Sequence, residues 1–165
     1  MAQVRRMAEP APQLVEETDD DREFMARLYA STRTEELAPV PWSDDEKATF
    51  LRGQFEAQDR HYREHYADTD RRVIRLDGTA VGRLYLQRRE GEFRIVDIAL
   101  LPEYRGRGVG GALLEQVFDE AATAAKPVRI HVEKNNPAYG LYQRLGFRKL
   151  EDKGVYDLLE WRPAH

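Results

Sequence analysis

The spacing of apolar residues changes along the chain, and each change marks an expected element. Residues Leu14–Glu17 predict a short strand, and the acidic residues that follow predict a helix from Asp19 to about Ala30, since acids favour a helix's first turn. A second helix is expected from Ser43, with Glu46 three residues later as a capping box. Its apolar residues recur at helical spacing. They are Leu51, Phe55, Tyr62 and Tyr66.

Strand-like patterns replace the helical pattern after Asp70. The runs Val73–Leu76 and Ala80–Gln87 are joined by Asp77-Gly78, a dipeptide typical of two-residue hairpins. Six further elements are expected after them, in the order strand, helix, strand, short helix, strand and strand. Their ranges are Phe93–Leu101, Gly108–Ala125, Val128–Val132, Pro137–Leu145, Phe147–Leu150 and Val155–Trp161. A helix pair, antiparallel strands and one strand–helix–strand crossover predict an α/β (α+β) fold with a mixed sheet.

Domain organisation and composition narrow the class of protein. Residues 1–13 are rich in Ala and Pro and are expected to be a flexible tail, before a single domain at residues 14–165. Of the 165 residues, 41% are hydrophobic and 34% charged, and no run reaches the roughly 18 apolar residues of a membrane span. The absence of cysteine excludes disulfides and thiolate chemistry, and it is compatible with the cytoplasmic location that we expect. A net charge of -4 argues against nucleic acid as a partner.

A glycine-rich loop between a buried strand and a helix is the most informative chemical signal. Its glycines let backbone amides crowd around an anion, and the helix that follows adds its positive dipole end. Two arginines add cations. We therefore expect a phosphate or pyrophosphate site rather than an ordinary turn. The residues expected to form it are Arg105, Gly106, Arg107, Gly108, Val109, Gly110 and Gly111.

The same glycines also spell a dinucleotide-binding fingerprint. Gly106, Gly108 and Gly111 match G-x-G-x-x-G, and Glu133 follows about twenty residues later, where a ribose-binding acid would be sought. However, Pro102 and the residues after it separate the loop from its strand, and only one crossover is visible where a dinucleotide fold needs several. The pattern disfavours a dinucleotide.

Two segments resemble the signatures of the GNAT acetyltransferases. Arg105–Gly110 (R-G-R-G-V-G) resembles the family's Q/R-x-x-G-x-G/A motif. Asn135–Tyr142 (N-N-P-A-Y-G-L-Y) resembles N-x-x-A-x-x-x-Y, and the usual L-G-F follows at Leu145–Phe147. The resemblance extends from about Val73 to Trp161 and is weaker for the two N-terminal helices.

This resemblance implies a GNAT fold: a central mixed, mostly antiparallel sheet of about six or seven strands with about four flanking helices. The sheet would be splayed between the strand ending at Leu101 and the strand Val128–Val132, with acetyl-CoA in the gap and no metal. The backbone of Leu100 and Leu101 would hold the pantetheine arm and thioester carbonyl. Asn135 would orient the arm. Tyr142 would be both a cofactor contact and the catalytic general acid, because a phenol stays protonated at neutral pH.

The implied reaction is N-acetylation, in which an amine attacks acetyl-CoA directly in a ternary complex. The general base stays open: Asp97 is a catalytic candidate because it lies in an apolar strand, His131 titrates in a useful range, and the family commonly uses a water chain. Asp97 and His131 also have structural interpretations. The alternative function is a non-catalytic module that senses acyl-CoA. A homodimer is compatible with either function.

Charge suggests the kind of acceptor. Glu16–Glu46 holds eleven acidic residues against three arginines, a net charge of −8, so the rest of the chain carries +4. Such a segment would concentrate a cationic amine, although acids at helix starts also stabilise helices regardless of function. A further pattern, H-x-x-E-H at His61–His65, matches a zinc-peptidase motif. It lacks an evident third ligand, and we expect no metal site.

Overall fold

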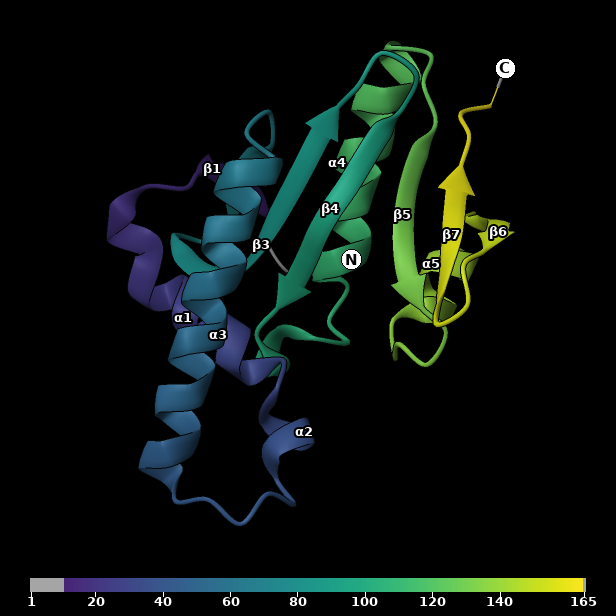
Figure 1. Ribbon diagram of the computed structural model, residues 1–165. Helices are drawn as coiled ribbons and strands as arrows, with labels where there is room; N and C mark the ends of the chain where they lie inside the picture. The colour runs from purple at the N-terminus through teal and green to yellow at the C-terminus, as the bar shows by residue number, and fades with distance from the viewer. Residues whose placement is uncertain (1–10, 165) are drawn as a thin grey trace, which may run out of the picture.

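The computed structural model describes residues 11–164, and within them the chain forms one seven-stranded mixed sheet (Figure 1). The strand order is β1-β2-β3-β4-β5-β7-β6, and every neighbouring pair is antiparallel except β4 with β5. The expected mixed, mostly antiparallel sheet is therefore confirmed. The strands are β1 (Gln13–Glu16), β2 (Asp70–Leu76), β3 (Thr79–Arg88), β4 (Phe93–Leu100), β5 (Val128–Glu133), β6 (Arg148–Asp152) and β7 (Tyr156–Trp161).

Helices cover both faces of the sheet. Between residues 11 and 164 they are α1 (Arg22–Ser31), α2 (Thr34–Leu37), α3 (Asp44–His65), α4 (Val109–Thr123) and α5 (Tyr139–Arg144), with 3₁₀ turns at Asp19–Asp21 and Pro102–Tyr104. The helices α1 and α3 lie on one face, while α4 and α5 lie on the other (Figure 1). None of the described helices is long and apolar enough to cross a membrane.

Two hydrophobic clusters hold these layers together. The larger lies between the sheet and the helices α4 and α5, where Leu113, Leu114 and Val117 are buried against β2 to β5. The smaller lies beneath α1 and α3 and includes Leu28 and Phe55. Because successive strand residues face opposite sides of a sheet, neighbours such as Val73 and Ile74 of β2 enter different clusters.

Local sequence signals account for several boundaries. Asp77 and Gly78 both have positive φ, +50° and +83°, as a two-residue type I′ hairpin requires. Ser43 caps α3, and its side chain accepts from the Glu46 amide in the predicted capping box. By contrast, β1 begins one residue earlier than expected, because Gln13 pairs with Arg75 of β2. Residues 1–10 of the expected tail lie outside the described residues.

Candidate functional site

The sheet opens between β4 and β5. These strands pair over three positions only, from Phe93 opposite Val128 to Ile95 opposite Ile130, although both strands continue beyond the last pair. Figure 1 shows them diverging toward the loop that precedes α4. We call this gap the splay. It lies where the sequence predicts it, between the strand ending near Leu101 and the strand that begins at Val128.

A β-bulge on β4 gives a physical reason for the splay. The consecutive β3 residues Tyr85 and Leu86 pair with Asp97 and Ile95, which leaves Val96 as an extra residue. A bulge bends its strand and increases the local twist. Because this bulge comes directly after the last β4–β5 pair, it turns β4 away from β5. It also places Asp97 on the face of Tyr85, toward α3, instead of the face of Ile95, toward α4.

The glycine loop leads into α4 in the expected conformation. Gly106 and Gly108 have φ values of +71° and +82°, in the left-handed region where glycine carries no steric penalty. A Cβ at either position, or at Gly111, would meet no atom within 4 Å, so the space above the loop is open. The first amide that bonds within α4 is that of Ala112, onto the Gly108 carbonyl. The amides from Val109 to Gly111 precede that bond, and such N-terminal amides suit an anion.

The loop arginines differ in their contacts. Arg105 is exposed, and its Nε donates to the Leu100 carbonyl at 3.1 Å, which ties the loop to the end of β4. Arg107 lies over the Tyr104 ring, 5.0 Å from its centroid, and donates to the Glu103 carbonyl at 3.3 Å. Both arginines belong to the glycine loop and add positive charge to it, so the residues of the loop fit the pyrophosphate of coenzyme A.

Successive backbone amides point in opposite directions where β4 ends at Leu100 and the chain continues to Leu101. The Leu101 amide donates to the Val81 carbonyl of β3 at 2.8 Å. Successive residues of a strand direct their amides to opposite edges, so the Leu100 amide is directed at the splay. That orientation suits the predicted contact with a pantetheine arm, whereas the Leu101 amide is used within the sheet.

Tyr142 lies in α5 and is 5% exposed, packed edge-on against Phe147. Its hydroxyl makes no hydrogen bond within residues 11–164. Burial, followed by the negative charge of Asp97, raises its pKa to about 12. Tyr142 is thus a protonated donor without an internal acceptor among the described residues.

Asn135 follows β5 in the turn that leads to α5, and its side chain is exposed. The neighbouring Asn136 organises this turn, because its Oδ1 accepts from the Ala138 amide at 2.7 Å. The two expected site residues of this segment, Asn135 and Tyr142, therefore lie before and within α5.

Asp97 belongs to a polar cluster that sequence reasoning missed. Its Oδ2 accepts from Arg83 at 2.6 Å and from the Tyr62 hydroxyl at 3.0 Å, and Arg83 also donates to Gln58 of α3. The Arg83 side chain is only 5% exposed, while that of Asp97 is 17% exposed. Asp97 Oδ1 makes no hydrogen bond within the described chain. The alternation of β3 could have shown that Arg83 faces the same side as Tyr85, but not which carboxylate it meets.

His131 is exposed on β5, and its Nδ1 lies 3.3 Å from Arg94 Nη1. Burial of its ring, followed by the Arg94 charge, lowers its pKa. A guanidinium can only donate, so Nδ1 is the acceptor and Nε2 carries the proton. That tautomer leaves no free lone pair to take a proton from an amine, which disfavours His131 as the base.

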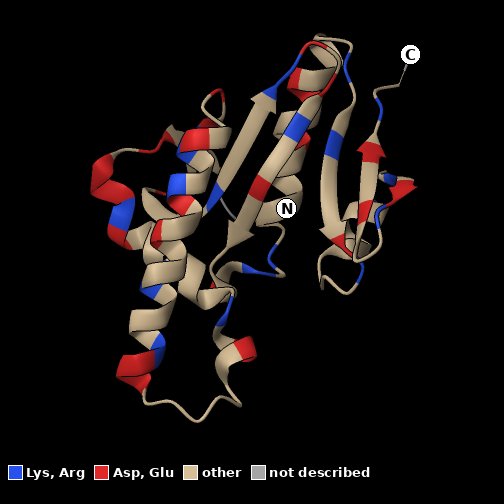
Figure 2. Cartoon of the chain, in the orientation of Figure 1, with Lys and Arg blue, Asp and Glu red and all other residues tan. Residues whose placement is uncertain are grey.

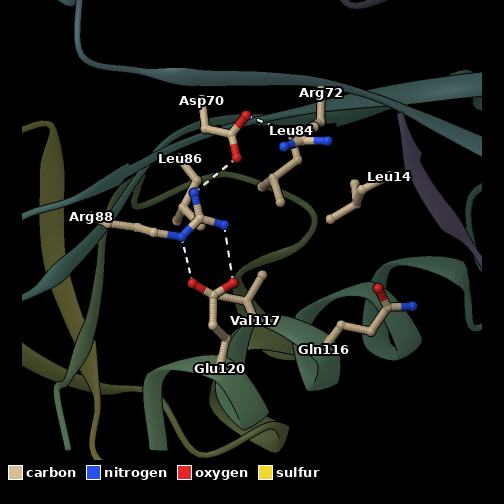
Figure 3. A pocket seen from close by; sticks show the side chains of 9 residues that line it. All are labelled: Leu14, Asp70, Arg72, Leu84, Leu86, Arg88, Gln116, Val117 and Glu120. Carbon is tan, nitrogen blue, oxygen red and sulfur yellow. Dashed lines mark hydrogen bonds and ion pairs between the residues drawn. The ribbon is translucent and has the colours of Figure 1, made fainter. Parts of the chain in front are cut away.

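Two other features do not form the site. His61 and His65 stack on α3 with ring centroids 4.5 Å apart, yet residues 11–164 contain no cluster of three potential metal ligands. A cavity of about 150 Å³ lies between α4 and strands β1 to β3 (Figure 3). There Arg88 bonds both Asp70 and Glu120, so its charges are paired. Glu120 lies eleven residues beyond the start of α4, about 16 Å from the glycine loop.

Comparison with known proteins agrees with this geometry. A family model described as an acetyltransferase (GNAT) domain matches residues 61–149, more than half of the chain. Over 59 residues the chain is 37% identical to an uncharacterised protein of Mycobacterium leprae, and the match covers 36% of this chain but 16% of that protein.

Solved structures share the fold. The PaiA N-acetyltransferase of Thermoplasma acidophilum, solved with coenzyme A, is similar with a TM-score of 0.70, at 16% identity over 92% of this chain and 99% of that chain. An acetyltransferase of Thermus thermophilus gives a TM-score of 0.69, at 19% identity over 94% and 99%. A histone acetyltransferase HPA2-related protein of Corynebacterium glutamicum gives 0.64, at 23% identity over 94% and 97%.

A mixed sheet opened by a bulge, with a glycine loop at the head of α4, is the fold that the chain shares with these acetyltransferase structures. Together with the family match, it shows that the chain belongs to the GNAT acetyltransferase family.

Proposed function

We propose that the chain is an acetyl-CoA-dependent N-acetyltransferase that acts on a free amine by direct attack in a ternary complex. The observation that carries this proposal is the Tyr142 hydroxyl, which is protonated and makes no hydrogen bond within residues 11–164. It belongs to α5, the helix that follows β5, and β5 is one of the two strands that border the splay. A module that only sensed acyl-CoA would have no need of such a donor. The same splay is flanked by the open glycine loop and by the Leu100 amide.

Each group has a proposed task in binding. The amides of the loop, from Gly106 to Gly111, hold the pyrophosphate, and Arg105 and Arg107 add positive charge. The Leu100 amide donates to the thioester carbonyl as negative charge develops on its oxygen, a contact whose loss costs roughly 3–4 kcal/mol of barrier in related oxyanion sites. Asn135 orients the arm of the cofactor.

Transfer then makes a nitrogen–carbon bond and breaks the carbon–sulfur bond. The sulfur leaves as a thiolate, which accepts a hydrogen bond and then a proton from Tyr142. Since the pKa of Tyr142 is about 12, this hydroxyl is fully protonated at neutral pH and regains its proton from solvent.

For the acceptor side we propose a role for Asp97 on the amine. Its Oδ2 is occupied by Arg83 and Tyr62, which leaves Oδ1 to accept a hydrogen bond from the amine. Because Arg83 pairs with the carboxylate of Asp97, we assign to Asp97 the task of orienting the amine. Water in the splay would carry the proton away.

The proposed acceptor is cationic in bulk solution. Figure 2 shows acidic residues before α1, at α2 and at the start of α3. The first group is the 3₁₀ turn Asp19–Asp21. The acidic segment Glu16–Glu46 would raise the local concentration of such an amine.

Thiol release tests this function. Acetyl-CoA is incubated with polyamines, amino acids, aminoglycosides and peptide N-termini, and the best acceptor is then used with Tyr142→Phe. That substitution removes one hydroxyl without an internal partner, so coenzyme A affinity and Tm should be unchanged while kcat falls roughly 10²–10⁴-fold. Coenzyme A binding without thiol release for any amine would favour the sensing module. An unchanged kcat, with chemistry rate-limiting, would remove Tyr142 from the mechanism.

A further inference from the structure

A buried carboxylate on β7 lies beneath the segment that carries two of the proposed site residues. Asp157 is 3% exposed, and its Oδ2 accepts from the Tyr139 hydroxyl at 2.5 Å. Its Oδ1 is buried and has no hydrogen-bond partner in the described chain, with Lys134 Nζ 3.8 Å away. Neither Asp157 nor Tyr139 belongs to the site described above.

Burial of this carboxylate is costly, which makes its position informative. A buried charge is destabilising unless it is well paired, and apolar residues of similar size are often at least as stable in its place. Lys134 binds more closely to Asp152, at 2.8 Å, than to Asp157. The principal contact of Asp157 is therefore the Tyr139 hydroxyl.

The helix that Tyr139 begins cannot hold its own orientation. α5 spans six residues, Tyr139–Arg144, far fewer than the roughly 12 to 15 that an isolated helix needs for even marginal stability. Its place on the sheet is therefore set by tertiary contacts. Tyr139 and Tyr142 are three residues apart, so they lie on the same side of the helix. A hydrogen bond that anchors Tyr139 thus also fixes the rotation of Tyr142.

One backbone hydrogen bond attaches the turn before α5 to the residue before β7, and a second closes the turn itself. The Lys134 amide donates to the Val155 carbonyl at 3.1 Å, just before β7, and the Tyr139 amide donates to the Asn136 carbonyl at 3.0 Å. Asn135 lies between these two attachments. Movement of the first residue of α5 would therefore move this turn as well.

We propose that Asp157 is a positioning residue for acyl transfer, which through Tyr139 fixes α5 and the preceding turn so that Tyr142 and Asn135 meet the acyl donor. This inference rests on the proposed function. It assigns to Asp157 no contact with either substrate.

Three variants separate this role from simple packing. Tyr139→Phe removes the hydroxyl and should lower kcat about 10- to 100-fold, the usual effect of a small misplacement near the chemistry. Asp157→Asn keeps an oxygen that accepts from Tyr139, and it should retain most of kcat. Tyr156→Phe is the matched control, since Tyr156 adjoins Asp157 on β7, is 44% exposed and has no side-chain hydrogen bond among the described residues.

All variants are assayed well below their Tm, with coenzyme A affinity measured by calorimetry. Affinity should change little in Tyr139→Phe, because the glycine loop lies on other elements. A lowered Tm with wild-type kcat in Tyr139→Phe would mean that the Asp157–Tyr139 bond only packs α5, and it would overturn the proposal. An equal loss of kcat in Asp157→Asn and Tyr139→Phe would also overturn it. The asparagine side chain keeps an oxygen that accepts from the Tyr139 hydroxyl, so Asp157→Asn should keep most of its activity.

A readout without turnover keeps this inference separate from the proposed function. In protein labelled with ¹³C-tyrosine, the Tyr142 ring resonance is assigned with Tyr142→Phe. It should shift in Tyr139→Phe and stay in place in Tyr156→Phe. A shift in a chain that acetylates no amine would refute the proposed function but support the anchoring of α5. An unchanged resonance would refute the anchoring itself.

Discussion

Replacing Gly108 by alanine tests the glycine loop most directly. Gly108 precedes α4 with φ +82° and ψ 0°, and a Cβ there would meet no atom within 4 Å. The cost in the free protein is therefore conformational alone, about 1–2 kcal/mol for a side chain in the left-handed region. At roughly 2–4 °C per kcal/mol for a chain of this length, Tm should fall by about 2–8 °C.

The effect on coenzyme A affinity should be larger than this strain suggests. The left-handed residue sets the direction of the amides that follow it, and alanine favours a negative φ that would turn the Val109 and Gly110 amides away. A hydrogen bond to a charged group contributes about 1.5–3 kcal/mol, so losing one weakens binding about 10- to 150-fold. Isothermal titration with coenzyme A measures this, alongside Tm for the free protein.

Gly154→Ala is the matched control for strain. Gly154 has φ +90° and an equally open Cβ position, but it lies in the turn between β6 and β7. Its Tm should fall by a similar amount, and its affinity for coenzyme A should stay at the wild-type value. Wild-type affinity in Gly108→Ala would refute the assignment of this loop, and so would an equal loss of affinity in Gly154→Ala.

Three more outcomes follow from the structure. Tyr142 acts in its protonated form, and with a pKa of about 12 it loses this form only as pH rises through that value. The plot of kcat against pH should therefore show no fall that depends on Tyr142 up to about pH 10. A fall centred near pH 10 that Tyr142→Phe abolishes would contradict this. Arg83→Met should lower the free energy of unfolding, measured with urea, by about 3–5 kcal/mol, because it leaves the Asp97 carboxylate without its cation. Adding Asp97→Asn should recover part of this loss. No recovery would mean that the ion pair is not the cause. If the acidic segment steers a cationic acceptor, Glu35→Gln with Glu36→Gln should raise the acceptor KM, and added salt should lower kcat/KM; an unaffected KM would reduce the segment to helix capping.

The sequence by itself determined the features that depend on near neighbours in the chain. The type I′ turn at Asp77-Gly78 follows from two residues that tolerate positive φ, and the start of α3 follows from Ser43 and Glu46. The glycine loop is equally local, since Gly106 and Gly108 enter the left-handed region as their residue type allows. Such signals need no knowledge of the partner strands.

Tertiary structure decided what depends on register and on distant partners. Only the pairing of β3 with β4 shows that Val96 is a bulge, and a shift of one residue decides whether Asp97 faces α3 or α4. In the sequence, Arg83 is only a charged residue within an apolar strand. The fold brings Asp97, fourteen residues further along the chain, within hydrogen-bond distance of it. The face of a side chain follows from strand pairing, and pairing is set by the energy of the whole sheet. No local pattern of residues encodes it.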